Sequence, residues 1–185
     1  MKKNVAPRSQ PLPRLSLVLG GAASGKSGFA EQLVQSAPDL RRIYLASAQA
    51  FDDEMRAKIA RHREIRAADG WETVEEPLAV AEALNARHDG EIVLFDCATL
   101  WLTNQMMAEA DLAAKTAALA SALATCAAPV VIVSNELGQG VVPELAMARR
   151  FREAHGRMNQ TLAVQADLVV HVIAGLPQVL KGQLQ

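Results

Sequence analysis

The sequence is poor in cysteine and has no excess of either charge. Its 185 residues include two cysteines, Cys97 and Cys126, which lie too far apart for a disulfide framework or a zinc site. A reducing compartment, the cytoplasm, is therefore expected. With 19 basic and 20 acidic side chains the formal net charge is −1. This balance argues against nucleic acid as the main partner, because proteins that coat nucleic acid usually carry a basic face.

Long hydrophobic runs are also missing. Residues 116–133 carry no charge, but they are rich in Ala, Thr and Ser, and Pro129 divides them into a helical pattern and a short apolar strand pattern. Residues 1–14 contain two lysines but no apolar h-region of a signal peptide, so they are expected to form a flexible lead. We therefore expect no membrane span and a single domain over residues 15–185.

Short apolar segments alternate with longer helical patterns along this domain. The segments are 15–20, 42–47, 91–96, 129–135 and 168–175. Continuous apolar runs of this length are typical of strands buried on both faces, and their alternation with helices predicts an α/β fold with a parallel sheet. Residues 67–78 lack either pattern and are expected to form an exposed connection.

The strongest chemical signal is GGAASGKS at residues 20–27, between a predicted strand and a predicted helix. It satisfies the pattern G-x-x-x-x-G-K-[ST] of loops that bind nucleoside triphosphates. Small residues let backbone N–H groups surround a phosphate, and the N-terminus of the helix favours the same anion. Lys26 would neutralise the β and γ phosphates, and the Ser27 hydroxyl would ligate Mg²⁺. The predicted contacts are Gly20, Gly21, Ala22, Ala23, Ser24, Gly25, Lys26 and Ser27.

Asp96 ends the apolar segment 91–96 and is a second candidate for the metal. It would hold Mg²⁺ directly or through water, or else it would cap the helix that follows. We favour the metal role, because ligands of open α/β sheets gather at the carboxyl ends of the strands. Cys97 is interpreted as a small buried residue, because no His or Lys adjoins it to activate a thiolate.

Residues 52–66 begin with acids and end with bases, which favours a helix. Met55, Ile59 and His62 share one face at this spacing, so His62 could simply border an apolar stripe. Four cations surround the histidine, namely Lys58, Arg61, Arg63 and Arg66. Such cations would lower the pKa of the imidazole and attract a polyphosphate, and a neutral imidazole could attack an α-phosphate. The residues by themselves leave both interpretations open.

Asn135 and Glu136 follow the apolar run PVVIVS at 129–134, which is expected beside the phosphate loop. Glu136 would orient a metal-bound water or bind substrate, or the segment is an ordinary turn with Pro143 opening the next helix. That next helix is rich in arginine, with Arg149, Arg150, Arg152 and Arg157. These could form a solvated face, which is the interpretation favoured for Arg150.

Taken in order, these segments resemble one known family. They are GGAASGKS at 20–27, ASAQ-x-x-DDEM-x-x-x-IARHR at 46–63, the strand ending in Asp96, SNELGQGVVP at 134–143 and R-x-FR-x-x-x-GR-x-NQ-x-LA at 149–163. The chain from about Leu15 onward is similar to the bifunctional adenosylcobinamide kinase/adenosylcobinamide-phosphate guanylyltransferases of cobalamin biosynthesis. The phosphate loop is common to many proteins, whereas the runs at 46–63 and 134–143 are specific to this family.

The resemblance implies two reactions. A nucleoside triphosphate, ATP or GTP, phosphorylates adenosylcobinamide, and GMP from GTP is then transferred through the enzyme onto that phosphate. His62 occupies the family's guanylylated position. Further nucleotide contacts implied by the resemblance are Ser47, Ala48, Gln49, Arg63, Glu64, Ile65, Arg66, Glu75 and Asp96. Position 96 is Asp where some relatives have Glu, which preserves the acidic contact.

The resemblance also implies the fold and the assembly. The expected fold class is α/β, a P-loop NTPase-like (RecA-like) domain with a mainly parallel sheet flanked by helices, assembled as a homo-oligomer. Mg²⁺ is the expected cofactor. Two alternatives remain: a P-loop kinase for a small molecule, in which His62 is structural, and a nucleotide-binding regulator with little turnover.

Overall fold

A computed structural model describes residues 13–49, 64 and 66–184. Its strands are β1 (Leu15–Gly20), β2 (Arg41–Ala46), β3 (Trp71–Glu75), β4 (Glu91–Asp96), β5 (Val130–Asn135), β6 (Leu168–Ile173) and β7 (Leu176–Lys181). Its helices are α1 (Lys26–Gln35), α3 (Val80–Asn85), α4 (Ala98–Met107), α5 (Leu112–Thr125) and α6 (Ala146–Gln165). Most of the predicted helix at 52–66, including His62, lies outside the described residues.

The strands form one sheet with the order β3-β2-β4-β5-β1-β6-β7. Neighbours from β3 to β6 pair in parallel, and β7 pairs antiparallel with β6. All five apolar segments that were predicted as strands are strands here, which confirms the mainly parallel α/β sheet. Residues 116–133 divide at Pro129 as predicted, since α5 ends at Thr125 and β5 begins at Val130.

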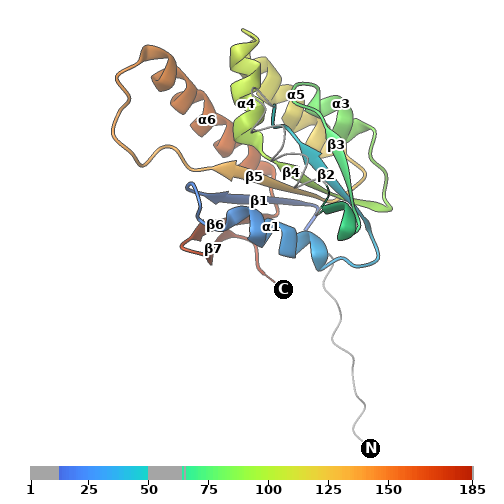
Figure 1. Cartoon of the computed structure of the whole chain (residues 1–185). Helices are drawn as coiled ribbons and strands as arrows, with labels where there is room; N and C mark the ends of the chain where they lie inside the picture. The colour runs from blue at the N-terminus through green and yellow to red at the C-terminus, as the bar shows by residue number, and fades with distance from the viewer. Residues whose placement is uncertain (1–12, 50–63, 65, 185) are drawn as a thin grey trace, which may run out of the picture.

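Helices cover both faces of the sheet, with α1 on one face and α3, α4, α5 and α6 on the other (Figure 1). Side chains of a strand alternate between these faces. In β1, Leu17 therefore packs in the core beneath α3 to α6, and Val18 packs in the core beneath α1. Both side chains are fully buried. Burial on two faces explains why these strands are continuous apolar runs in the sequence.

The prediction of an exposed connection at 67–78 was wrong for its central residues. Residues 71–75 form β3, an edge strand that pairs in parallel with β2. Trp71 is 6% exposed and its ring meets the Tyr44 ring edge-on, with 6.1 Å between the centroids. An edge strand is less covered than an inner strand and therefore tolerates polar residues. For this reason β3 lacks the continuous apolar run by which the inner strands were predicted.

The strand expected at 168–175 is confirmed over its first six residues, as β6, and ends at Ile173. The chain turns at Ala174 and Gly175, which have φ of 51° and 78°, and returns as β7. Every residue of β7 is exposed, so its sequence does not have the apolar run that is typical of a buried strand. In the described part of the chain, no helix is long and apolar enough to cross a membrane.

Candidate functional site

The phosphate loop connects β1 to α1 at the carboxyl end of β1, an inner strand of the sheet, and two of its glycines are required by geometry. A Cβ on Gly20 would lie 2.7 Å from the carbonyl oxygen of Val172 and 2.4 Å from Oγ of Ser24. Gly25 adopts a left-handed φ of 92° as the N-cap of α1. Side chains at these two positions would distort the loop, so its glycines fix the curve of the backbone.

The loop presents donors to an anion. Gly25 has no side chain to cap α1, and the first turn of α1 contains no acidic residue, so its N–H groups favour an external negative group. The Lys26 ammonium lies back over the loop and donates to the carbonyl of Gly21 at 3.0 Å. The hydroxyl oxygen of Ser24 is buried and has no hydrogen-bond partner among the described residues. These features fit a loop that closes around a phosphate.

The turn between β6 and β7 supports the phosphate loop from the side. The N–H of Gly175 donates to the carbonyl of Ser24 at 2.8 Å. A Cβ on Gly25 would lie 3.2 Å from the Cα of Gly175, so the two backbones approach closely. Sequence reasoning missed this contact, because residues 24 and 175 are far apart in the chain and meet only through the pairing of β1 with β6.

The strand order places two acidic residues, Glu136 and Asp96, at the carboxyl ends of neighbouring strands. β5 lies between β1 and β4, so Glu136 follows the strand beside the loop, and its N–H donates to the carbonyl of Gly20 at 3.0 Å. Asp96 lies one strand further, about 10 Å from the end of β1 at ordinary strand spacing. The expected position of Glu136 beside the phosphate loop is confirmed. The Glu136 carboxylate itself accepts from the N–H of Gly138.

Asp96 is held by Tyr44, whose hydroxyl donates to its Oδ2 at 2.8 Å. Burial, and then the neighbouring Asp96 carboxylate, raise the pKa of Tyr44 above its ordinary value, so the phenol stays protonated and donates. The alternative that Asp96 caps the next helix was wrong. Cys97 is the N-cap of α4, and its Sγ accepts from the N–H of Leu100 at 3.4 Å.

Cys97 is buried, as expected. Burial and the Asp96 carboxylate raise the pKa of its thiol to about 11, while the Lys26 ammonium opposes this shift. A thiol that stays protonated at neutral pH is a poor nucleophile. Because the Asp96 carboxylate and the Lys26 ammonium both shift the pKa of the Cys97 thiol, both groups lie near Cys97.

The donors at this edge fit Mg²⁺. The Ser27 hydroxyl and the Asp96 carboxylate are hard oxygen ligands, the kind that Mg²⁺ prefers. Within the described part of the chain, no group of three or more His, Cys, Asp or Glu side chains could hold a metal by itself. Mg²⁺ would therefore be bound together with the nucleotide phosphates, as is usual for this ion.

Ser47 supports the start of α4 with its side chain. Its buried hydroxyl donates to the carbonyl of Cys97 at 2.8 Å and accepts from the N–H of Cys97 at 3.0 Å. Its own carbonyl accepts from the amide of Asn104 at 2.8 Å. Direct contact between this segment and a nucleotide would therefore come from Ala48 and Gln49, which are partly exposed.

The other nucleotide contacts implied by the resemblance are only partly described. The Arg66 guanidinium lies over the Tyr44 ring, 3.4 Å from its centroid. Glu75 ends β3 next to Ala46 in the register and is exposed. Glu64 is exposed. The remaining predicted residues, His62, Arg63 and Ile65, lie outside the described residues.

A buried polar cluster lies beneath the end of β5. The Nε2 atom of His155 lies 3.0 Å from the Thr99 hydroxyl and 3.3 Å from the Ser134 hydroxyl. The Ser134 hydroxyl donates to Oδ1 of Asn159 at 2.7 Å. Asn159 donates in turn to the carbonyl of Asn135 at 3.0 Å, and the Thr99 hydroxyl accepts from the N–H of Asn135 at 2.8 Å. This cluster fixes the backbone immediately before Glu136. Ser134 and Asn159 belong to the family segments at 134–143 and 149–163, but no pattern in the sequence indicated that they meet His155 and Thr99.

Acid is expected to destabilise the fold through His155. Burial lowers the pKa of His155 below its ordinary value of 6.5, so the unfolded chain binds a proton more readily than the folded one. The free energy of unfolding contributed by this group therefore falls as the pH decreases from about 6.5 toward the folded pKa. Chemical denaturation across this range measures the slope. His155→Gln should reduce it, and an unchanged slope in the variant would contradict the assignment.

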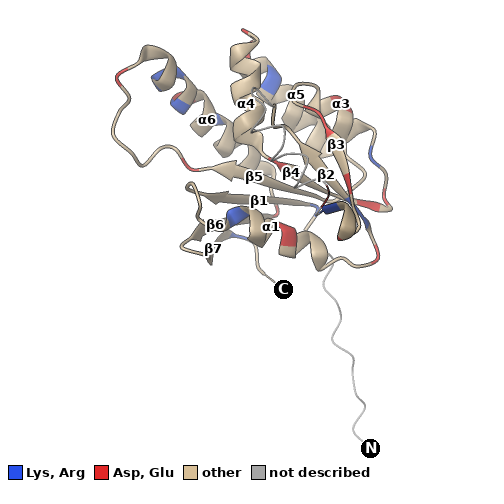
Figure 2. Cartoon of the chain, viewed as in Figure 1, with Lys and Arg blue, Asp and Glu red and all other residues tan. Residues whose placement is uncertain are grey.

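The arginines of α6 have two different roles. Arg149 donates to the carbonyls of Pro143 and Glu144, and Arg152 donates to those of Gly138 and Val141. These two side chains therefore hold the loop between β5 and α6, and a purely solvated face does not describe them. Figure 2 shows the basic residues on the end of α6 that carries this loop. Arg150 is exposed, as expected.

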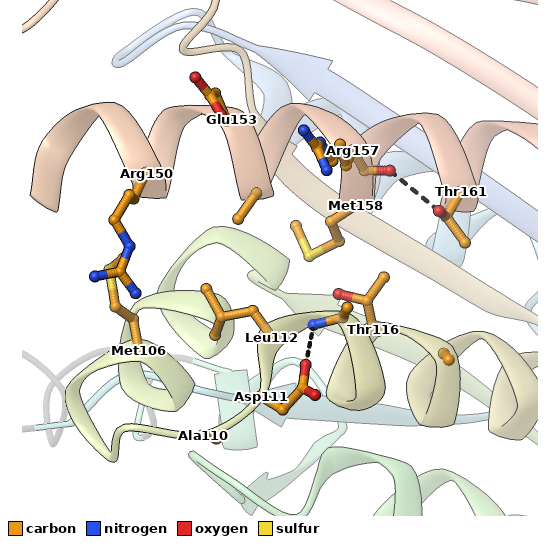
Figure 3. Close-up of a pocket in the computed structure, with 13 residues that line it drawn as sticks. Met106, Ala110, Asp111, Leu112, Thr116, Arg150, Glu153, Arg157, Met158 and Thr161 are labelled. Atoms are coloured by element: carbon orange, nitrogen blue, oxygen red, sulfur yellow. Dashed lines mark hydrogen bonds between the residues drawn. The ribbon is translucent and has the colours of Figure 1, made fainter. Parts of the chain in front are cut away.

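A surface cavity of about 560 Å³ separates α6 from the junction of α4 and α5. Arg150, Arg157 and Met158 reach it from α6, and Asp111 and Leu112 line the opposite side (Figure 3). None of the predicted phosphate, metal or nucleotide contacts lines this cavity.

Known proteins resemble this chain over almost its whole length. The family described as cobinamide kinase / cobinamide phosphate guanyltransferase matches residues 16–180. The bifunctional adenosylcobalamin biosynthesis protein CobP of Pseudomonas aeruginosa is 42% identical over 170 residues, which cover 90% of this chain and 97% of that protein. The bifunctional adenosylcobalamin biosynthesis protein CobU of Escherichia coli is 38% identical over 176 residues, which cover 86% of this chain and 96% of that protein.

Among solved structures, the RadB recombinase matches 86% of this chain and 74% of its own chain, with a TM-score of 0.52 and 18% identity. At this identity the likeness concerns the fold alone, and it agrees with the expected RecA-like P-loop architecture. The extent of the family match and the identity to the two bacterial proteins establish that the chain belongs to the cobinamide kinase / cobinamide phosphate guanyltransferase family.

Proposed function

We propose that this protein phosphorylates adenosylcobinamide with ATP or GTP and then transfers GMP from GTP onto that phosphate through His62. The main observation in support of this proposal is the family match over residues 16–180, in a chain whose phosphate-loop motif is complete. The products are adenosylcobinamide-GDP and pyrophosphate. The protein would work in the cytoplasm as a homo-oligomer.

In the first step the phosphate loop binds the nucleoside triphosphate, and Lys26 neutralises charge that develops between the β and γ phosphates. Ser27 and Asp96 would hold Mg²⁺ with the phosphates. When bound, Mg²⁺ supplies charge neutralisation at the phosphate oxygens. Glu136 lies next to the loop through its N–H bond to Gly20. We expect its carboxylate to orient the substrate hydroxyl or a water on the metal.

In the second step a neutral nitrogen of His62 attacks the α-phosphorus of GTP. A P–N bond forms, the bond to the β-phosphate oxygen breaks, and pyrophosphate leaves. An oxygen of adenosylcobinamide phosphate then attacks the same phosphorus, and the imidazole leaves. The cations near His62 in the sequence support this role, because they favour the neutral imidazole and attract GTP.

The covalent step predicts a labelled protein. Incubation with Mg²⁺ and GTP labelled at the α-phosphate, followed by denaturing electrophoresis, should give label that is acid-labile and alkali-stable. His62→Ala should abolish this label, because the variant has no attacking nitrogen. His88→Ala is the matched control, since His88 lies on the surface next to Glu91 at 3.2 Å and outside the family motifs. It should be labelled as the wild type is.

Two results would favour the alternatives. Phosphorylation of adenosylcobinamide without any labelled protein would support a kinase in which His62 is structural. Tight GTP binding with no product from any corrinoid would support a nucleotide-binding regulator.

A further inference from the structure

We propose that Tyr44 is a positioning residue that holds the Asp96 carboxylate and the Arg66 guanidinium in one fixed arrangement. The inference rests on the proposed function, in which Asp96 serves the metal and Arg66 contacts the nucleotide. Tyr44 lies within β2 and is 5% exposed. Its hydroxyl and its ring contact different functional groups, so one side chain connects two parts of the site.

The hydroxyl of Tyr44 sets the orientation of Asp96. Tyr44 pairs with Leu94 in the register of β2 and β4, and Asp96 lies two residues further along β4. Because side chains alternate along a strand, Tyr44 and Asp96 project from the same face of the sheet. The bond of 2.8 Å to Oδ2 restrains the carboxylate against rotation. Partners of this kind, which orient a ligand without touching the metal, commonly change metal affinity or activity by about 10- to 100-fold.

The ring of Tyr44 supports Arg66. The guanidinium lies 3.4 Å from the ring centroid, and the Trp71 ring meets the Tyr44 ring edge-on at an interplanar angle of 79°. Trp71 thus fixes the ring, and the ring fixes the guanidinium plane. A stacked guanidinium keeps its N–H groups directed outward from its edge, where they can bind phosphate or base oxygens. Tyr44 therefore contacts both Arg66 and Asp96, which lie 30 residues apart in the sequence.

The first test removes the hydroxyl alone. Tyr44→Phe keeps the ring and its contacts with Arg66 and Trp71. Dissociation constants for a fluorescent GTP analogue would be measured in Mg²⁺ and in EDTA. We expect the tightening by Mg²⁺ to decrease by about tenfold in the variant, with binding in EDTA unchanged. Asp96→Asn should also lose the tightening of GTP binding by Mg²⁺. The double variant should lose little more than either single variant, because both substitutions disrupt the same hydrogen bond between Tyr44 and Asp96.

The second test removes the ring. Tyr44→Leu and Arg66→Ala should each weaken nucleotide binding about three- to tenfold in EDTA, where the metal plays no part. The double variant should bind no more weakly than the weaker single variant. Tyr44→Phe should differ from both, because its ring still supports the guanidinium.

A structural role for Tyr44 would give a different pattern. Ile43→Val is the matched control, since Ile43 is a fully buried neighbour on β2 that packs in the opposite core. It should lower the melting temperature without changing either dissociation constant. If Tyr44→Phe behaves like Ile43→Val, or weakens binding equally in Mg²⁺ and EDTA, the inference is wrong.

The same data separate this inference from the proposed function. Loss of the Mg²⁺ effect in Asp96→Asn but not in Tyr44→Phe would overturn the role of Tyr44 and leave the metal role of Asp96 intact. An unchanged Mg²⁺ effect in Asp96→Asn would overturn the metal role itself, and the positioning role of the Tyr44 hydroxyl with it.

Discussion

Lys26→Ala is expected to lower kcat/KM for the phosphorylation of adenosylcobinamide by about a hundred- to a thousandfold. Lys26 is the first residue of α1, and its ammonium group lies over the phosphate loop, where it donates a hydrogen bond to the carbonyl of Gly21. Preorganised donors of this kind act where charge develops in the transition state, and removing one usually has an effect of about this size. Steady-state kinetics with ATP and with GTP measure the change.

The fold should tolerate this substitution. Lys26 is partly exposed, and the substitution removes its hydrogen bond to the carbonyl of Gly21, so the free energy of unfolding should change by about 1 kcal/mol or less. Lys115→Ala is the matched control, because Lys115 is exposed on α5, away from the loop. It should leave kcat/KM unchanged. A Lys26→Ala enzyme with near wild-type kcat/KM would show that the phosphate loop does not serve phosphoryl transfer.

Gly20→Ala is expected to destabilise the fold by about 2–3 kcal/mol and to weaken nucleotide binding at the same time. The added Cβ would lie 2.7 Å from the carbonyl oxygen of Val172, which is backbone of the neighbouring strand β6 and cannot rotate away. Relief requires β1 and β6 to separate or the loop to shift, and overpacking of this kind typically costs about 1–3 kcal/mol. Denaturant unfolding and nucleotide titration measure the two effects.

The adjacent glycine provides an unusually close control. A Cβ on Gly21 would meet no atom within 4 Å, and its φ is not in the left-handed region. Gly21→Ala should therefore leave the free energy of unfolding within about 0.5 kcal/mol of the wild type. Equal destabilisation by both substitutions would show that the conformational freedom of the loop, and not the approach of Val172, requires glycine at position 20.

Much of the fold follows from local patterns. The apolar runs in β1, β2, β4, β5 and β6 indicate strands because burial on both faces leaves few polar positions in them. The two edge strands were missed for the same reason. Three of the five residues of β3 are polar, and β7 is fully exposed, so neither has the continuous apolar run that is typical of buried strands.

The sequence by itself determined the phosphate loop, because its chemistry belongs to consecutive residues between one strand and one helix. The family motifs likewise fixed the residues proposed for both reactions. Only the tertiary structure decided which of them meet: the strand order sets Glu136 beside Gly20, and the register of β2 and β4 places Tyr44 against Asp96. It also turned the Ser47 hydroxyl inward toward Cys97. Residues distant in the chain become neighbours through strand pairing, and no local pattern of residues encodes that pairing.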